Sequence, residues 1–262
     1  MTVTVTMTEA SATGAYTGPV LAVHGLEVHY GPLHAVREMS FEVGKGELVA
    51  LLGANGAGKS SLLRAIVGLE RPAKGSVTLL GTNLTGVARH RRAHMGMGFV
   101  PEGRGVFPTM TVEENIVVPL GRDADRTRAL GIAFDLFPVL GERRKQVAGS
   151  MSGGEQQMLS LARALAGEPS LLLVDELSLG LAPMVVRQLI DKVGELRDGG
   201  MSILLVEQFA HAALLVADRA GIVVRGRMTR LGPAADLVAL SRDELVQEYF
   251  GTGRDAEAGA TT

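Results

Sequence analysis

A glycine-rich segment between an apolar run and a helical pattern constrains this chain more than any other feature. The segment is Gly53–Ser60, with the sequence GANGAGKS. The run Glu47–Leu52 before it is typical of a buried strand, and the apolar spacing in Ser60–Val67 predicts a helix that ends at Gly68. Glycines let successive backbone N–H groups turn toward a phosphate, and the N-terminal end of the helix attracts the same negative charge. The segment is therefore predicted to be a phosphate loop.

The phosphate loop assigns a chemical role to individual side chains. We expect Lys59 to reach the β- and γ-phosphates of ATP, and the Ser60 hydroxyl to ligate Mg²⁺. The alternative is a glycine-rich turn that matches the pattern by accident, and the strand before it and the helix after it argue against that. The residues predicted to contact the nucleotide here are Gly53, Asn55, Gly56, Gly58, Lys59, Ser60 and Ser61.

A second motif is an apolar run that ends in two acids. Leu171–Val174 is followed directly by Asp175 and Glu176. Carboxylates at the end of a buried strand are costly to desolvate unless cations or water meet them. We expect Asp175 to hold Mg²⁺ through its water shell and Glu176 to polarise an attacking water. A solvated acidic turn is the alternative, but beside a phosphate loop the pair favours ATP hydrolysis.

Apolar runs and turn residues predict strands that alternate with helices. Strands are expected at Leu21–Tyr30, Ala35–Val43, Glu47–Leu52, Gly75–Leu80, Leu171–Val174 and Ile203–Val206, and a closing hairpin at Ile222–Arg225 and Met228–Leu231. Helices are expected at Ser60–Val67, Gln156–Ala166 and Met184–Arg197, within a stretch from 87 to 166 that reads as mostly helical. This order predicts an α/β fold with an antiparallel β lobe at the start and a helical insertion at about 87–157.

The two ends of the chain differ from the rest in composition. Residues 1–19 and 252–262 are rich in Thr, Ala and Gly without periodicity, which predicts disordered tails around one domain at 20–251.

A third motif makes the pattern specific to one family. Ser152-Gly153-Gly154, followed by Glu155 and then a helix, lies between the phosphate loop and the acidic strand. A glycine-opened helix start would explain the segment alone, but the three motifs in this order resemble an ABC-type ATPase subunit. The resemblance implies that Ser152, Gly153 and Gly154 grip the γ-phosphate of ATP held by another protomer, with Gly154 facing that partner.

The resemblance also implies roles for three further residues. Tyr30 matches the aromatic residue that stacks on adenine, although a strand aromatic that packs on the core would look the same. Glu102 lies where most members carry a glutamine that senses Mg²⁺ and the attacking water, and Gln208 where most carry a histidine that contacts the γ-phosphate. The implied catalytic residues are Glu176, Glu102 and Gln208, and the implied metal-binding residues are Ser60, Asp175 and Glu102.

Several segments together resemble one branch of this family, the smaller ATPase subunit of the high-affinity branched-chain amino acid importer. They are Val100–Arg104, Phe107-Pro108, Met110–Asn115, Ser178–Pro183 and Val206–Gln208, whereas Leu177 replaces the proline usual in this branch. The branch implies membrane permease subunits, a second ATPase subunit and, indirectly, a solute-binding protein as partners. There are two alternatives. One is an importer ATPase for urea or short amides, and the other is a soluble non-transport ATPase that acts on nucleic acid or ribosomes.

Composition narrows the class of protein further. The chain has 26 Lys plus Arg against 28 Asp plus Glu, so no strong attraction to nucleic acid is expected. It contains no cysteine, which excludes disulfides and thiolate metal sites. No apolar run approaches the length of a membrane-spanning helix and no signal peptide is visible, so we expect a cytoplasmic protein peripheral to the inner face of the membrane. The basic run Arg89–Arg92 is expected to be a solvated face.

Overall fold

A six-stranded sheet forms the centre of the molecule. The computed structural model describes residues 16–121 and 123–240. In sheet order the strands are β10 (Arg227–Pro233), β9 (Arg219–Val224), β3 (Leu48–Leu52), β8 (Ser202–Glu207), β7 (Leu171–Asp175) and β6 (Met97–Val100). The pairs from β9 to β6 are parallel, and β10 adds an antiparallel edge.

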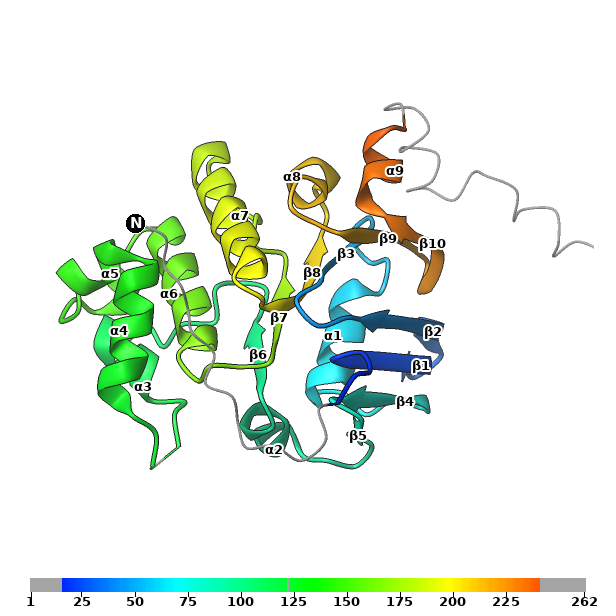
Figure 1. Cartoon of the computed structure of the whole chain (residues 1–262), viewed down its shortest axis with the longest axis horizontal. Coiled ribbons are helices and arrows are strands. Elements are labelled where there is room, and N and C mark those ends of the chain that lie inside the picture. Colours follow the sequence, from blue (N-terminus) through cyan, green and yellow to red (C-terminus); the bar gives the residue numbers. More distant parts are fainter. Residues whose placement is uncertain (1–15, 122, 241–262) are drawn as a thin grey trace, which may run out of the picture.

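A second, antiparallel sheet lies beside the first (Figure 1). Its strands, in order, are β2 (Leu33–Val43), β1 (Leu21–Tyr30), β4 (Lys74–Leu79) and β5 (Thr82–Asn83). Helix α1 (Lys59–Val67) packs between the two sheets, and its buried Leu62, Leu63 and Ile66 share one core with both. The antiparallel lobe predicted from the sequence is confirmed.

The other helices cover the opposite face of the central sheet or connect its strands. Their bounds are α2 (Arg89–His94), α3 (Val112–Val117), α4 (Arg126–Leu136), α5 (Pro138–Glu142), a 3₁₀ turn at Ala148–Ser150, α6 (Gly153–Leu165), α7 (Pro183–Asp198), α8 (Ala210–Leu214) and α9 (Ala234–Val238). Helices α3 to α6 gather at one side of the molecule in Figure 1. None of the helices in the described part of the chain combines the length and the apolar character that crossing a bilayer requires.

Both faces of the central strands are buried, which explains their continuous apolar runs. In β3, Val49 and Leu51 face the core around α1, whereas Leu48, Ala50 and Leu52 face the core formed with α6 and α7. A strand covered on both sides has no reason to alternate apolar with polar residues. The predicted α/β fold class is confirmed.

Local signals fix where the helices begin and end. Gly68 ends α1 in the left-handed conformation, with φ of 79°. Capping boxes begin α3 at Thr111 and α6 at Ser152, and Pro183 is the first residue of α7. The helix predicted at Gln156–Ala166 therefore begins three positions earlier than expected, because Ser152 and Glu155 satisfy its first N–H groups.

Two expectations for the region 87–166 were wrong in part. Within the stretch expected to be mostly helical, Met97–Val100 is a strand, β6, paired with β7. In the basic run, Arg89, His90 and Arg91 are exposed as expected, but Arg92 is buried. Its guanidinium donates to the carbonyl oxygens of Ala65 (3.0 Å) and Ile66 (2.6 Å), and also to Leu84 and Val87. Arg92 thus donates to two carbonyl groups in the last turn of α1, where the hydrogen-bond ladder of the helix ends.

The predicted tails lie mostly outside the described residues. This applies to residues 1–15, to 252–262 and to the predicted end of the domain at 251, so these boundaries stay predictions.

Candidate functional site

Three neighbouring parallel strands bring the predicted site together. Leu52 at the end of β3 pairs with Glu207 of β8, and Asp175 at the end of β7 pairs with Val206 of the same strand. The carboxyl ends of β3, β7 and β8 therefore meet at one edge, the usual place for ligands in open α/β sheets. The phosphate loop, the acidic pair and Gln208 all leave the sheet from this edge.

The phosphate loop is closely surrounded by backbone. A Cβ atom at Gly53 would collide with the carbonyl oxygen of Val223, and one at Gly58 with that of Ala35. Gly58 also has φ of 103°, a conformation that L side chains rarely adopt. The Gly226 N–H of the β9–β10 turn donates to the Ala57 carbonyl at 2.8 Å. The fold itself thus requires glycine at positions 53 and 58.

Lys59 is buried at the centre of the loop, with only 3% of its surface exposed. Its Nζ donates to the carbonyl oxygens of Gly53 (2.9 Å) and Ala54 (3.2 Å). The same Nζ lies 3.3 Å from Oε1 of Glu176. The structure therefore joins the predicted phosphate-binding lysine directly to the predicted catalytic acid, and the pair compensates part of the cost of burying each charge.

Ser60 and Asp175 form the second contact between the loop and the acids. The Ser60 hydroxyl donates to Oδ1 of Asp175 at 3.0 Å, and Asp175 is only 2% exposed. Burial raises the pKa of Asp175 to about 6, with further increases from the nearby Glu176 and Glu102 and opposing effects of Ser60 and Lys59. Glu102 therefore acts electrostatically on this site even though its side chain is exposed.

The donor set suits a divalent cation bound together with a nucleotide. A hydroxyl and a carboxylate oxygen in contact are the kind of hard ligands that Mg²⁺ takes, with phosphate oxygens and water completing its shell. In the described ranges, no three His, Asp or Glu residues form a metal cluster. Ser60 and Asp175 would thus hold Mg²⁺ in company with the nucleotide.

Glu176 directly follows β7 and is held by a backbone hydrogen bond to β8. It leaves β7 in a left-handed conformation, with φ of 48°, and its N–H donates to the Val206 carbonyl of β8 at 2.9 Å. The next residue, Leu177, is buried in the core with α6 and α7. Because Leu177 anchors the segment, the carboxylate of Glu176 stays at the edge of the sheet beside Lys59.

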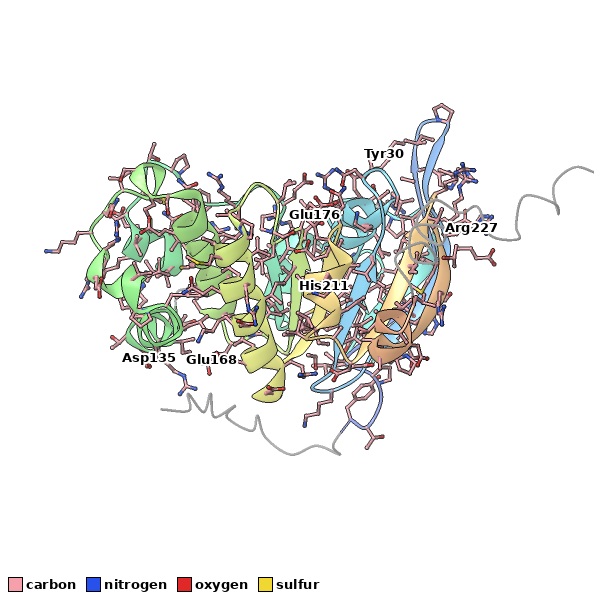
Figure 2. The ribbon with its side chains drawn as sticks, turned by 90° about the horizontal axis from the view of Figure 1, so that it is seen from above. Tyr30, Asp135, Glu168, Glu176, His211 and Arg227 are labelled. Carbon is pink, nitrogen blue, oxygen red and sulfur yellow. The ribbon has the colours of Figure 1, made fainter. Side chains whose placement is uncertain are left out.

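The other predicted nucleotide contacts surround this centre. Tyr30 is 37% exposed at the end of β1, and Figure 2 shows it along the same edge of the molecule as Glu176. Asn55 is exposed, whereas Ser61 and Gln208 are half-buried. All of them belong to elements that end or begin at this edge.

The segment Ser152–Gly154 does not join this centre. It begins α6, which lies on the far side of β6 and β7 from α1 (Figure 1). Ser152 accepts from the Glu155 N–H, and the Ser152 N–H donates to Glu155 Oε2. A Cβ at Gly154 would lie 2.7 Å from Cγ1 of Val185 on α7 of the same chain, so the packing within one chain already favours glycine here, and its contact with a partner stays a prediction.

Sequence reasoning missed a buried carboxyl group next to the site. Glu207, the last residue of β8, is 1% exposed, and burial raises its pKa. It accepts hydrogen bonds from the backbone N–H (3.1 Å) and the hydroxyl (2.6 Å) of Ser178. The signal available in the sequence was an acid directly after the continuous apolar run Ile203–Val206.

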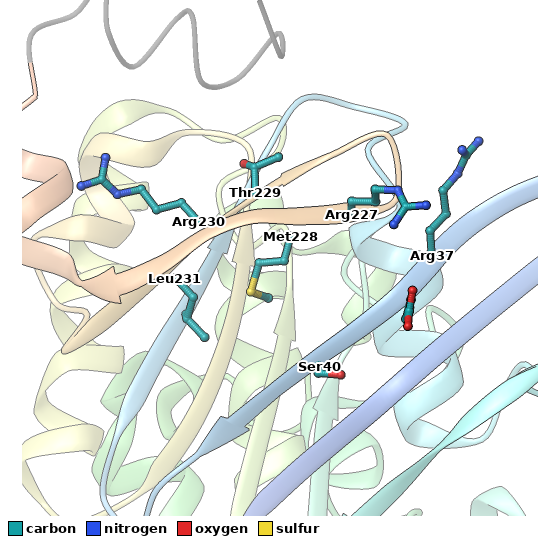
Figure 3. A pocket seen from close by; sticks show the side chains of 8 residues that line it. Arg37, Ser40, Arg227, Met228, Thr229, Arg230 and Leu231 are labelled. Atoms are coloured by element: carbon teal, nitrogen blue, oxygen red, sulfur yellow. The ribbon is translucent and has the colours of Figure 1, made fainter. Parts of the chain in front are cut away.

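A groove of about 340 Å³ between β2 and β10 is separate from the site (Figure 3). Arg37 and Arg227 lie toward one end of it and Arg230 toward the other. None of the predicted site residues lines it.

Comparison with known proteins gives consistent similarities over most of the chain. A family model described as "ABC transporter" matches residues 36–178. The chain is 42% identical to the high-affinity branched-chain amino acid transport ATP-binding protein BraG of Pseudomonas aeruginosa, over 88% of this chain and 100% of that protein. It is 36% identical to the probable branched-chain amino acid transport ATP-binding protein LivF of Archaeoglobus fulgidus, over 81% of this chain and 92% of that protein. A solved ATP-binding subunit of an ABC transporter has a TM-score of 0.75 at 27% identity, covering 88% of this chain and 99% of that one.

The raised pKa of Asp175 predicts that its charge lowers the stability of the ligand-free protein in a pH-dependent way. Its folded pKa of about 6 lies above the ordinary value of 3.8 for an aspartate, so stability present below pH 3.8 is lost as the pH rises through 6. Asp175→Asn should therefore be more stable than the parent at pH 7.5, by up to about 3 kcal/mol, and the difference should disappear near pH 4. Urea unfolding in EDTA without nucleotide measures this.

The matched control is Asp135→Asn, which removes an exposed carboxylate of α4. It should change stability little at either pH. Equal stability of Asp175→Asn and the parent at pH 7.5 would contradict the prediction.

Proposed function

The chain belongs to the ABC transporter family, and on that premise we propose that its phosphate loop, Asp175 and Glu176 form the site at which it hydrolyses ATP. The resemblance inferred from the sequence is thereby confirmed at the level of the family. The observation that carries the site proposal is the pair of contacts Lys59–Glu176 and Ser60–Asp175. These join two motifs, far apart in the sequence, into one buried group of charges.

Each residue of this group has a distinct task in the proposal. Lys59 supplies a positive charge to the β- and γ-phosphate oxygens. Its partners in this structure, two carbonyl oxygens and a carboxylate, occupy the place of those phosphate oxygens. Ser60 and Asp175 hold Mg²⁺, whose charge stabilises the negative charge that develops on the phosphates. Glu176, released from Lys59, orients the attacking water and polarises it.

Four further residues complete the proposed nucleotide site. Glu102 and Gln208 lie beside the acids, where they contact Mg²⁺, the attacking water or the γ-phosphate. Tyr30 stacks on adenine from the end of β1. The exposed Asn55 lies at the outer side of the loop.

The site of one chain is completed by a second protomer. The separation of Ser152–Gly154 from the phosphate loop within one molecule supports this, because a single chain does not bring the two together. The N-terminal end of α6 carries the positive end of the helix dipole, which favours an anion such as the partner's γ-phosphate. The partner is another copy of this chain or a sister ATPase subunit.

The ATPase works beneath membrane permeases and imports branched-chain or similar amino acids. The names of the relatives BraG and LivF support this solute. An importer of this kind places its ATPase on the cytoplasmic side of the membrane. It also needs a solute-binding protein that delivers the amino acid. Residues 20–251 form one ATPase domain.

The loop 101–108 is the proposed link to the permease. Phe107 is 45% exposed, its backbone is held by the buried Asn115 side chain, and Arg163 of α6 lies 5.2 Å from its ring centroid. Arg104 donates to Gln156 of α6 at 2.9 Å. The loop therefore connects Glu102 with the helix that carries the signature segment Ser152–Gly154.

Replacing the proposed general base separates binding from turnover. Glu176→Gln should keep ATP affinity and lower the turnover number by about 10²–10⁴-fold, because the amide cannot accept the proton of water. Steady-state phosphate release and titration with a fluorescent nucleotide measure the two quantities.

Lys59→Ala is the matched comparison, since it removes the partner of the same ion pair. It should weaken nucleotide binding itself. An ATPase rate of Glu176→Gln close to that of the parent would rule out the assigned role.

The cross-protomer role of the signature segment can be tested without disturbing the helix. Ser152→Asp retains a good N-cap but adds a negative charge where the partner's γ-phosphate would bind. In a Glu176→Gln background it should abolish ATP-dependent dimers, measured by light scattering, whereas the isosteric neutral Ser152→Asn should preserve them. Dimers of the Asp variant as abundant as those of the Asn variant would refute the assignment.

The solute is tested by uptake in cells. Deleting the gene should abolish uptake of labelled leucine, isoleucine and valine, because hydrolysis powers the permeases, while labelled urea serves as control. Loss of urea uptake with leucine uptake intact would show that the solute is urea and not a branched-chain amino acid. The proposal that the chain hydrolyses ATP would be unaffected. Intact uptake of both would favour a non-transport role.

A further inference from the structure

Glu207 is a buried acid that the proposed reaction does not use. It ends β8 with 1% of its surface exposed, and burial is the main cause of its raised pKa. The groups that oppose this rise are hydrogen-bond donors of Ser178 and Gln208, with no basic side chain among them. A buried carboxyl group held without a cation is costly, so its retention calls for a specific role.

Both oxygens of this carboxyl group engage the same residue. Oε1 accepts from the Ser178 N–H at 3.1 Å, and Oε2 accepts from the Ser178 hydroxyl at 2.6 Å. Two parallel bonds of this kind fix orientation as well as distance. Glu207 therefore holds Ser178 in one position relative to β8.

The two residues joined in this way lie next to the proposed catalytic groups. Ser178 follows Glu176 by two positions, and Gln208 directly follows Glu207. The segment after β7 turns sharply, with positive φ at Glu176 (48°) and at Gly180 (70°), and it forms no regular element before α7. Within the segment, the Leu179 N–H donates to the Glu176 carbonyl at 3.3 Å and the Leu181 N–H to the Ser178 carbonyl at 3.4 Å. Its hydrogen bonds to β8 are the one from the Glu176 N–H to the Val206 carbonyl and the two from Ser178 to Glu207, so Glu207 supplies the side-chain contact that holds the segment to β8.

We propose that Glu207 is a positioning residue for ATP hydrolysis, which acts through Ser178 to fix Glu176 relative to Gln208. The inference rests on the roles proposed above for Glu176 and Gln208. Through this contact Glu176, which activates water, and Gln208, which lies near the γ-phosphate, keep the same relative position throughout the turnover cycle. Misplacement of a catalytic group by about 1 Å is enough to lower the reaction rate by a factor on the order of 10².

The chemistry of the contact explains why an acid occupies this place. Ser178 presents two donors, an N–H and an O–H, and a carboxylate presents two acceptors in a fixed fork. A glutamine keeps one acceptor but turns an NH₂ group toward a donor. An apolar pair of similar volume would fill the space at a smaller desolvation cost, but it would not fix the direction of the segment.

The test compares the rate and the binding constant in the full-length chain. Glu207→Ala and Ser178→Ala should each lower kcat for ATP about 10- to 100-fold with KM little changed, since neither residue contacts the nucleotide. Glu207→Gln should lie between Glu207→Ala and the parent. The double variant should lose no more than the worse single variant, because both remove the same contact.

A matched control distinguishes positioning from stability. Ser202 is a buried serine at the opposite end of β8, whose hydroxyl accepts from the Gly46 N–H at 2.9 Å. Ser202→Ala should lower the thermal midpoint to a similar extent as Ser178→Ala while kcat stays at the parent value. If Glu207→Ala does not fold, Ser178→Ala and Glu207→Gln carry the test.

The outcomes separate this inference from the function on which it rests. Loss of activity in Glu176→Gln, together with parental kcat in the Glu207 and Ser178 variants, would overturn the positioning role alone. Strictly additive losses in the double variant would overturn it too. Parental activity in Glu176→Gln would refute the proposed site itself, whatever the Glu207 variants do.

Discussion

The parallel pairing of β3, β8 and β7 is the constraint on which the rest of the structure depends. Leu52 pairs with Glu207 and Asp175 pairs with Val206, so three strands end together and three functional segments leave from one edge. A shift of one residue would move every side chain of a strand to its other face. Each face packs against its own core with its own neighbours, so the register sets the geometry of the site.

Burial of charged groups at this edge determines the electrostatics of the site. One ammonium group, Lys59, faces the carboxyl groups of Asp175 and Glu176, and Glu207 lies close behind them. Acids thus outnumber bases, and the pKa of Asp175 rises to about 6 as a result of burial and of its acidic neighbours. A divalent cation reverses this imbalance, which is consistent with a site that reaches its working arrangement together with Mg²⁺ and ATP.

Features encoded by neighbours in the sequence were predictable, and features that depend on distant contacts were not. The phosphate loop, the acidic pair and, to within one residue, the start of α7 were predicted from a few consecutive residues. Strand β6 was missed because four residues containing Gly98 show no pattern until they pair with β7. Arg92 was misplaced because a basic run reads as solvated, whereas its carbonyl partners come from α1 and from the chain before α2.

The sequence by itself determined the α/β fold, the family, and the residue types that meet a nucleotide, because these depend on periodicity and on short motifs. Only the tertiary structure decided how those residues are joined. Ser60 contacts Asp175 across 115 positions, Lys59 pairs with Glu176, Glu207 holds Ser178, and Gly154 faces its own α7. The physical reason is that a motif specifies local backbone and chemistry, whereas the partner of a buried side chain is set by strand register and by the packing of elements far apart in the chain.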